Sequence, residues 1–201
     1  MTTRDRILDA AAHVMRTRGL ARATTKEIAK AAGFSEAALY KHFRDKTEIF
    51  LAVLAERTPS HLGPLLAGLN GRVGQATVQA TLEEVAAAAV EFYRQSFPMA
   101  ASLFSEPQLL AAHRDALHER DAGPQHVGNA LAAYLAAEQR IGRIHPEADP
   151  HAAAALLLGA CLQRAFLGHF TAPNSAADTT NQFAGSLTTT LFRGLLPAES
   201  A

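Results

Sequence analysis

The sequence of 201 residues contains no tryptophan and has one cysteine, Cys161. A single cysteine cannot form an intrachain disulfide, so a disulfide-stapled secreted scaffold is excluded and a reducing compartment is favoured. Residues 1–20 lack the apolar core of a signal peptide. The longest apolar run, residues 152–162, is shorter than the about 20 residues that cross a bilayer. We expect a soluble, cytoplasmic protein in which this run forms a buried helix.

An excess of charge of one sign is also absent, since 19 Lys and Arg balance 19 Asp and Glu. The distribution is nevertheless uneven: residues 1–57 hold 11 Lys and Arg against 7 Asp and Glu, and residues 58–201 hold 8 against 12. Such a division is typical of a polyanion-binding head joined to a body with another task. It also arises by chance, and the charges alone do not decide between these two explanations.

Alanine is abundant, with 43 copies, and it forms helices well and strands poorly. Apolar positions recur at helical spacing and no stretch alternates like a strand, which predicts an all-α fold of about nine helices. Glycine and proline cluster in residues 58–74, so we expect a junction there between domains of residues 1–57 and 58–201. We expect the long helices at about residues 76–97, ending before Pro98, at 100–120 with a break or kink at Pro107, and at 125–140, 150–170 and 178–195.

Two short helices are predicted to meet at Gly33. The first begins after a cap at Thr24 or Thr25, and the second is capped by Ser35. This spacing is that of a helix–turn–helix, whose second helix enters the major groove of DNA. A capped glycine turn can occur in any helical hairpin, so the turn by itself leaves both interpretations open.

The longer segment is more specific. Residues 24–50 read T-x-x-x-I-A-x-x-A-G-F-S-x-x-x-L-Y-x-H-F-x-x-K-x-x-I-F, which resembles the N-terminal domain of TetR-family transcriptional regulators. The preceding I-L-D-A-A and the helix stop at Gly19 are similar to that family too. The specific resemblance covers residues 4–56, and the rest of the chain resembles the family only in length, helicity and the look of its last helices. One departure is Ala37, which stands where many members have glycine, so the approach of the backbone to DNA can differ there.

The resemblance implies a repressor that binds a palindromic DNA operator as a homodimer, with one head on each half-site. It also implies dimerisation through the last two helices and a small, largely apolar effector in the C-terminal helical domain, whose binding releases the DNA. Residues 152–155 and Gly159 form a helical face of small side chains, where we expect the dimer seam. A DNA-binding regulator without ligand control is an alternative that the sequence leaves open.

The resemblance places the DNA contacts on the second helix and its flanks. An alanine methyl can touch a thymine methyl, a lysine can donate to guanine, and a glutamate can accept from cytosine. Tyr40 could instead pack on Phe43 in the core, and His42 could be a polar cap at the helix end. The expected base contacts are Glu36, Ala37, Ala38 and Lys41, and the expected phosphate contacts are Thr25, Lys26, Ser35, Tyr40, His42 and Lys46.

Large side chains in the C-terminal part are candidates for an effector pocket, although aromatic residues are only 6% of the chain. A helical bundle lined by such groups can hold an apolar ligand with one or two polar anchors. Core packing explains each of these residues at least as well. The candidates are Phe92, Tyr93, Phe97, Met99, Phe104, His113, Tyr134, Gln163, Phe166 and Phe170.

Enzyme motifs are missing from the sequence. It has nine histidines, but no H-E-x-x-H, no C-x-x-C, no G-x-G-x-x-G or P-loop, and no G-x-S-x-G. Cys161 lies in an apolar helical stretch, which disfavours a nucleophile. We therefore expect no catalytic residues, no metal and no cofactor, and a helical enzyme is the rival that we consider less favoured.

Overall fold

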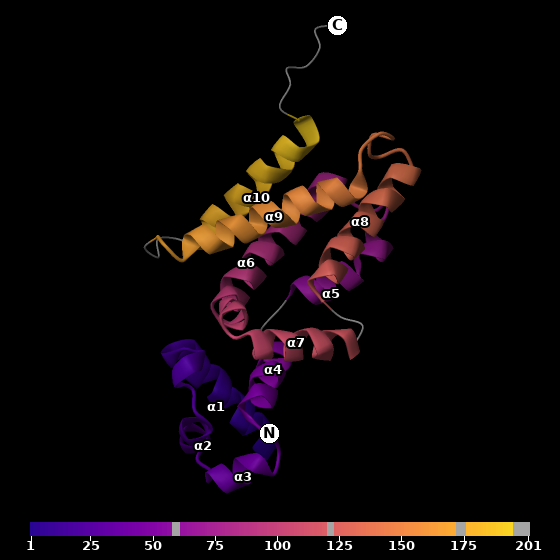
Figure 1. Cartoon of the computed structure of the whole chain (residues 1–201). Coiled ribbons are helices and arrows are strands. Elements are labelled where there is room, and N and C mark those ends of the chain that lie inside the picture. Colours follow the sequence, from indigo (N-terminus) through magenta and orange to yellow (C-terminus); the bar gives the residue numbers. More distant parts are fainter. Residues whose placement is uncertain (58–60, 120–122, 172–175, 195–201) are drawn as a thin grey trace, which may run out of the picture. The chain divides into compact units, whose positions relative to one another are not determined.

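The computed structural model describes residues 1–57, 61–119, 123–171 and 176–194. Throughout these residues the regular secondary structure is helical, as the alanine content predicts (Figure 1). Ten α-helices and two short 3-10 helices lie in the described residues, against about nine helices expected, and the all-α prediction is confirmed. The helices are α1 (Thr3–Arg18), η1 (Leu20–Arg22), α2 (Thr25–Ala32), α3 (Glu36–Tyr40), α4 (Lys46–Glu56), α5 (Leu62–Ala67), η2 (Leu69–Arg72), α6 (Val78–Ser105), α7 (Pro107–Glu119), α8 (Pro124–Arg140), α9 (Pro150–Gly168) and α10 (Ala176–Arg193).

The chain divides into two compact units. Unit 1 contains Met1–Pro59 and Gln95–Ala122, and unit 2 contains Ser60–Arg94 and Gly123–Ala201. Residues 95–119 thus pack with the N-terminal residues, which the sequence did not suggest. The assignment of separate functions to residues 1–57 and 58–201 stays a prediction.

Unit 1 is built on a core that its helices share. The apolar positions of α1 recur every three or four residues, so Ile7, Leu8 and Ala11 lie on one face and are fully buried. They join Ile28 of α2 and Ile49 of α4 in one cluster. Burying such side chains stabilises the fold by about 1.5–3 kcal/mol each, and this shared core holds α2 and α3 in place beside α1 and α4.

The turn between α2 and α3 has the geometry that the sequence predicts. Gly33 takes the left-handed conformation, with φ 76° and ψ 30°, at the C-terminus of α2, where a side chain would be strained. The hydroxyl of Thr24, rather than that of Thr25, caps α2 by accepting from the Glu27 N–H. Ser35 caps α3 by accepting from the Ala38 N–H at 3.2 Å. The helix–turn–helix is therefore present at the predicted residues.

Helix α6 is longer than the sequence predicts. It runs from Val78 to Ser105 with Pro98 inside it, so the prediction that a helix ends before Pro98 is wrong. Proline removes one backbone N–H from the helix, but Val90 and Met99 on either side of it are both buried. We infer that packing along the helix outweighs the lost hydrogen bond. The predicted break at Pro107 is present, since α7 begins there.

Helix α9 begins as predicted, with Asp149 accepting from two backbone N–H groups and Pro150 at the first position. It packs against α8 and α10, and Leu157 and Cys161 are buried. Its other face is exposed, with Leu156 at 65% and Leu167 at 50%, so the helix that the sequence predicts to be buried is buried on one face only. By length and composition alone α9 is long and apolar enough to cross a membrane, whereas the sequence predicts that the apolar run of residues 152–162 is too short. The core helix of a soluble protein passes the same test.

Candidate nucleic-acid interface

The four expected base contacts lie on a short segment that opens with α3. Ala37 and Lys41 are exposed, and Ala38 and Glu36 are partly buried. Lys41 stands at the C-cap of α3, one helical turn after Ala37, so both lie toward solvent. The small side chain of Ala37 would let the backbone of α3 come close to a flat surface such as the edge of a base pair.

Two of the expected phosphate contacts are hydrogen-bonded to each other and to Glu36. The hydroxyl of Thr25, the first residue of α2, donates to Glu36 Oε1 at 2.5 Å. The hydroxyl of Tyr40 donates to Thr25 Oγ1 at 3.4 Å. Tyr40 is 50% exposed, so it is not the core residue that the alternative interpretation required. The carboxylate of Glu36 therefore faces the start of α2.

The remaining expected phosphate contacts surround this cluster in sequence. Lys26, Ser35 and His42 are exposed. Lys46 Nζ donates to the carbonyl oxygen of Leu20 at 2.7 Å, which holds the start of α4 to η1. An ammonium has three protons, so two N–H groups of Lys46 remain to donate elsewhere.

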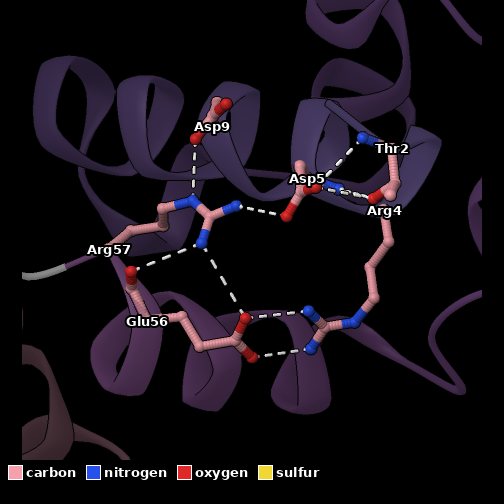
Figure 2. Close-up of polar contacts among 6 residues, drawn as sticks. All are labelled: Thr2, Arg4, Asp5, Asp9, Glu56 and Arg57. Atoms are coloured by element: carbon pink, nitrogen blue, oxygen red, sulfur yellow. Dashed lines mark hydrogen bonds and ion pairs between the residues drawn. The ribbon is translucent and has the colours of Figure 1, made fainter.

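Two arginines, one in α1 and one directly after α4, are paired with carboxylates (Figure 2). Arg57 donates to Asp9 at 2.7 Å and to Asp5 at 2.9 Å. Arg4 forms a two-pronged pair with Glu56, at 2.6 and 2.8 Å. These pairs tie α1 to the C-terminal end of α4, so these arginines serve the fold.

The same contacts shift the titration of the groups involved. The hydroxyl and backbone N–H of Thr2, followed by the guanidinium of Arg57, hold the pKa of the Asp5 carboxyl well below its usual value. The hydrogen bond that Arg57 donates to Asp9 raises the pKa of Arg57, and the one that Arg4 donates to Glu56 raises the pKa of Arg4. The charged forms of all three groups are therefore favoured in the folded chain.

The remaining cations of residues 1–57 divide into those with a carboxylate partner and those without one. In addition to Arg4 and Arg57, Arg18 pairs with Glu27 at 2.8 Å and Arg44 pairs with Glu48 at 3.2 Å. Within this segment, the cations whose side chains form neither an ion pair nor a hydrogen bond are Arg16, Arg22, Lys26, Lys30 and Lys41. The available positive charge therefore includes the exposed side chains of α2 and the end of α3, next to the expected DNA-contacting residues.

Lys30 is a candidate that the sequence reasoning missed. It is exposed and stands four residues after Lys26 on α2, so the two ammonium groups lie on the same side of the helix. The spacing of these lysines was visible in the sequence. What the sequence did not show is that both lack a carboxylate partner.

The comparisons with known proteins agree with this geometry. Residues 7–53 match the family model described as bacterial regulatory proteins, tetR family. The N-terminal region of this chain is therefore similar in sequence to the tetR family of bacterial regulatory proteins. The HTH-type transcriptional regulator SrpR of Pseudomonas putida is 47% identical over 55 residues, which span 27% of this chain and 26% of that protein. AcrR of Shigella flexneri is 40% identical over 63 residues, 31% of this chain and 29% of the relative, so these curated relatives match over about a quarter of their length.

Solved structures extend the likeness in fold to nearly the whole chain. PfmR, a TetR-family regulator from Thermus thermophilus, has a TM-score of 0.67 at 23% identity and covers 96% of this chain and 100% of its own. FadR of Bacillus subtilis, solved with stearoyl-CoA, has 0.67 at 18%, with 96% and 99% covered. SmeT, the repressor of a Stenotrophomonas maltophilia multidrug efflux pump, has 0.64 at 22%, with 100% and 98% covered. These likenesses show that the chain has the fold of this family.

The candidate effector-pocket residues do not lie together in one unit. In unit 2, the half-buried rings of Phe92 and Tyr93 are in contact, with centroids 5.4 Å apart, and Tyr134 is fully buried. Gln163, Phe166 and Phe170 are exposed on α9 and just after it. The others belong to unit 1, where Met99 is in the core, Phe97 and His113 are partly buried and Phe104 is exposed. Burial lowers the pKa of His113, and the pocket itself stays a prediction.

A hollow is also present in unit 1, on the side of α2 where the helix begins. Its lining residues are Thr17, Arg18, Arg22, Thr24 and Glu27. The Arg18–Glu27 ion pair lies in it, so Arg22 is the arginine of this hollow that no carboxylate neutralises. Among the described residues no group of three or more His, Cys, Asp or Glu side chains is arranged to hold a metal ion.

Proposed function

We propose that this chain is a DNA-binding transcriptional regulator whose segment of residues 1–57 reads a palindromic operator. The observation that carries the proposal is the helix–turn–helix of α2 and α3, with unpaired lysines on α2 and at the end of α3, in the region that matches the tetR family. Lysines there would bind phosphates and set the register of the protein on the duplex. Ala37, Ala38, Lys41 and Glu36 would then face base edges in the major groove.

The regulator acts as a homodimer in this proposal, because a palindrome offers two equivalent half-sites. The exposed apolar side chains of α9 and α10 are the surface that we assign to the dimer. They include Leu156, Leu162, Phe166, Leu167 and Phe192. Pairing two such faces would bury side chains that a soluble monomer would leave in water.

We further propose that it is a cytoplasmic repressor released by a small, largely apolar effector bound within residues 58–201. Two proteins of the same fold support this direction: FadR was solved with stearoyl-CoA, and SmeT is a repressor of a multidrug efflux pump. DNA binding without ligand control is the second form of the proposal, and screening compounds that release DNA distinguishes the two forms.

The test is selection of bound duplexes from a random pool, followed by affinity measurements against salt concentration. We expect an enriched inverted repeat, a dimer on the DNA, and a steep loss of affinity as salt rises. Lys26→Ala should reduce the salt slope by about one unit, while Arg140→Ala, an exposed cation of unit 2, should leave it unchanged. A chain that stays monomeric at micromolar concentration and enriches no sequence would overturn the proposal.

A further inference from the structure

The hydroxyls of Thr25 and Tyr40, which we expect to donate to DNA phosphates, form a hydrogen-bonded chain that ends at the carboxylate of Glu36. Tyr40 donates to Thr25, and Thr25 donates to Glu36. Each hydroxyl has a single proton, so both protons are directed along this chain toward the carboxylate. In this arrangement the Thr25 proton is held by the carboxylate, and the Tyr40 proton is directed to Thr25 over the longer distance of 3.4 Å. The 2.5 Å distance to Glu36 is that of a strong bond to a charged acceptor.

Glu36 is not required to build the helix on which it stands. Ser35 already caps α3 through the Ala38 N–H, and Leu39, which is fully buried, anchors α3 in the core of unit 1. The same unit pairs its other first-turn acid on α2, Glu27, with Arg18. In contrast, Glu36 forms no ion pair within the part of the chain that the structure describes, although Lys41 lies only five residues away in sequence. Glu36 thus keeps a negative charge without a cationic partner on the helix that faces DNA in the proposed function, and this charge is unfavourable beside phosphates.

We propose that Glu36 is a specificity-determining residue that makes the phosphate contacts of Thr25 and Tyr40 conditional on the base sequence. This inference rests on the proposed DNA-binding function. On a matching half-site, the N4 amino group of a cytosine in the major groove donates to Glu36. The carboxylate then leaves Thr25, and the hydroxyls of Thr25 and Tyr40 turn to donate to phosphates.

On a non-matching sequence the same side chain opposes binding. The carboxylate finds no donor on the base edge, so it keeps the Thr25 proton and its charge repels the nearby phosphates. Two unit charges about 4 Å apart in water interact by about 1 kcal/mol, which is about fivefold in affinity. Glu36 therefore weakens binding to wrong sequences while a cytosine at the right position relieves that penalty.

The experiment compares the wild-type chain with Glu36→Gln on two duplexes, the selected operator and a version with scrambled half-sites. Binding is followed by fluorescence anisotropy at one salt concentration. The amide that replaces the carboxylate still accepts from Thr25 but carries no charge, so we expect binding to the scrambled duplex to strengthen about fivefold. The preference for the operator should fall by about that factor, and exchange of one C·G pair in each half-site should weaken the wild type more than the variant, because a carboxylate is the stronger acceptor for the cytosine amino group.

Glu27→Gln is the matched control, because it removes the same charge from the same unit at a residue paired with Arg18. It should change both affinities alike and leave the preference intact. Thr25→Val is a second test of the proposal. In a chain without the Thr25 hydroxyl, Glu36→Gln should change the affinity for the operator less than it does in the wild type, because the conditional phosphate contact of Thr25 is gone. Circular dichroism melting of each variant confirms that the comparison is made on folded protein.

The outcomes distinguish failure of the proposed role of Glu36 from failure of the proposed DNA-binding function. A wild-type chain that prefers the operator, together with a Glu36→Gln variant whose preference is unchanged or whose losses match those of Glu27→Gln, would overturn the role of Glu36 alone. A wild-type chain with no preference for any selected duplex would overturn the proposed function and this inference together.

Discussion

Replacing Arg143 with methionine would leave the Glu138 carboxylate buried without its charged partner. Glu138 is fully buried on α8, and its Oε2 lies 3.1 Å from Nη1 of Arg143, whose side chain is 30% exposed. Glu138 Oε1 also accepts from the Gly74 N–H at 3.1 Å, and Arg143 donates to the carbonyl of Ala76. The pair therefore links α8 and the segment that follows it to the loop before α6.

The magnitude follows from the burial of the carboxylate. Removing one partner of a buried ion pair costs about 3–5 kcal/mol. Because the Arg143 side chain is partly exposed, we expect the Arg143→Met variant to lose an amount near the lower end of this range. We therefore expect the free energy of unfolding to fall by about 3 kcal/mol. With a urea slope of about 2 kcal/mol/M, the midpoint should move down by about 1.5 M. Equilibrium unfolding at one fixed protein concentration measures this shift.

Two further variants test the reasoning. Arg94→Met removes a pair with Glu91 in which both side chains are about half exposed, so we expect a loss of at most about 0.5 kcal/mol. Glu138→Gln combined with Arg143→Met removes the buried charge while the amide oxygen still accepts from Gly74, and this double variant should be more stable than Arg143→Met alone. Equal losses in Arg143→Met and Arg94→Met, or a double variant no more stable than the single one, would refute the argument.

Three other expectations concern unit 1. Gly33→Ala places a side chain at φ +76° and should destabilise the chain by about 1 kcal/mol, measured by thermal unfolding; an unchanged melting temperature would contradict it. Because the pKa of Asp5 is depressed in the folded state, its contribution to stability is present above about pH 4 and is lost as the pH falls below that value. Asp5→Asn should therefore lose stability at pH 7 and show a flatter decline between pH 4 and 2, which acid titration followed by circular dichroism can check. Lys46→Ala should weaken binding to all duplexes alike, whereas Lys41→Ala should cost about 1–3 kcal/mol at one or two base pairs; if Lys41→Ala weakens every duplex equally, it contacts only phosphate.

Much of the local structure was predictable because it depends on neighbours in sequence. The caps at Thr24 and Ser35 and the stop at Gly33 follow from hydroxyl groups that accept nearby N–H groups and from the freedom of glycine at positive φ. The starts of α7 and α9 follow from proline at the first helical position. These interactions span five residues or fewer, so the sequence contains both partners side by side.

The errors fall where distant residues compete with local preference. Proline at residue 98 should end a helix, yet α6 continues through it because apolar residues on both sides are buried. The apolar run in α9 predicts a buried helix, but Leu156 and Leu167 are exposed while Leu157 and Cys161 are buried. In both cases the result depends on which elements pack against the helix, and periodicity alone does not give that information.

At the candidate site, the amino-acid sequence was enough to predict which side chains stand on α3 and its flanks, and its tetR-like pattern suggests their roles. Which of these side chains are available depends on the folded chain. The fold pairs Arg4 and Arg57 with carboxylates, leaves Lys26 and Lys30 without ion pairs, and joins Thr25, Tyr40 and Glu36 through hydrogen bonds. Ion pairs and side-chain hydrogen bonds join atoms a few ångströms apart, but the residues that carry them lie 11 to 52 positions apart in the chain. Helix formation depends on neighbours in sequence, whereas the charge presented to a partner depends on neighbours in space.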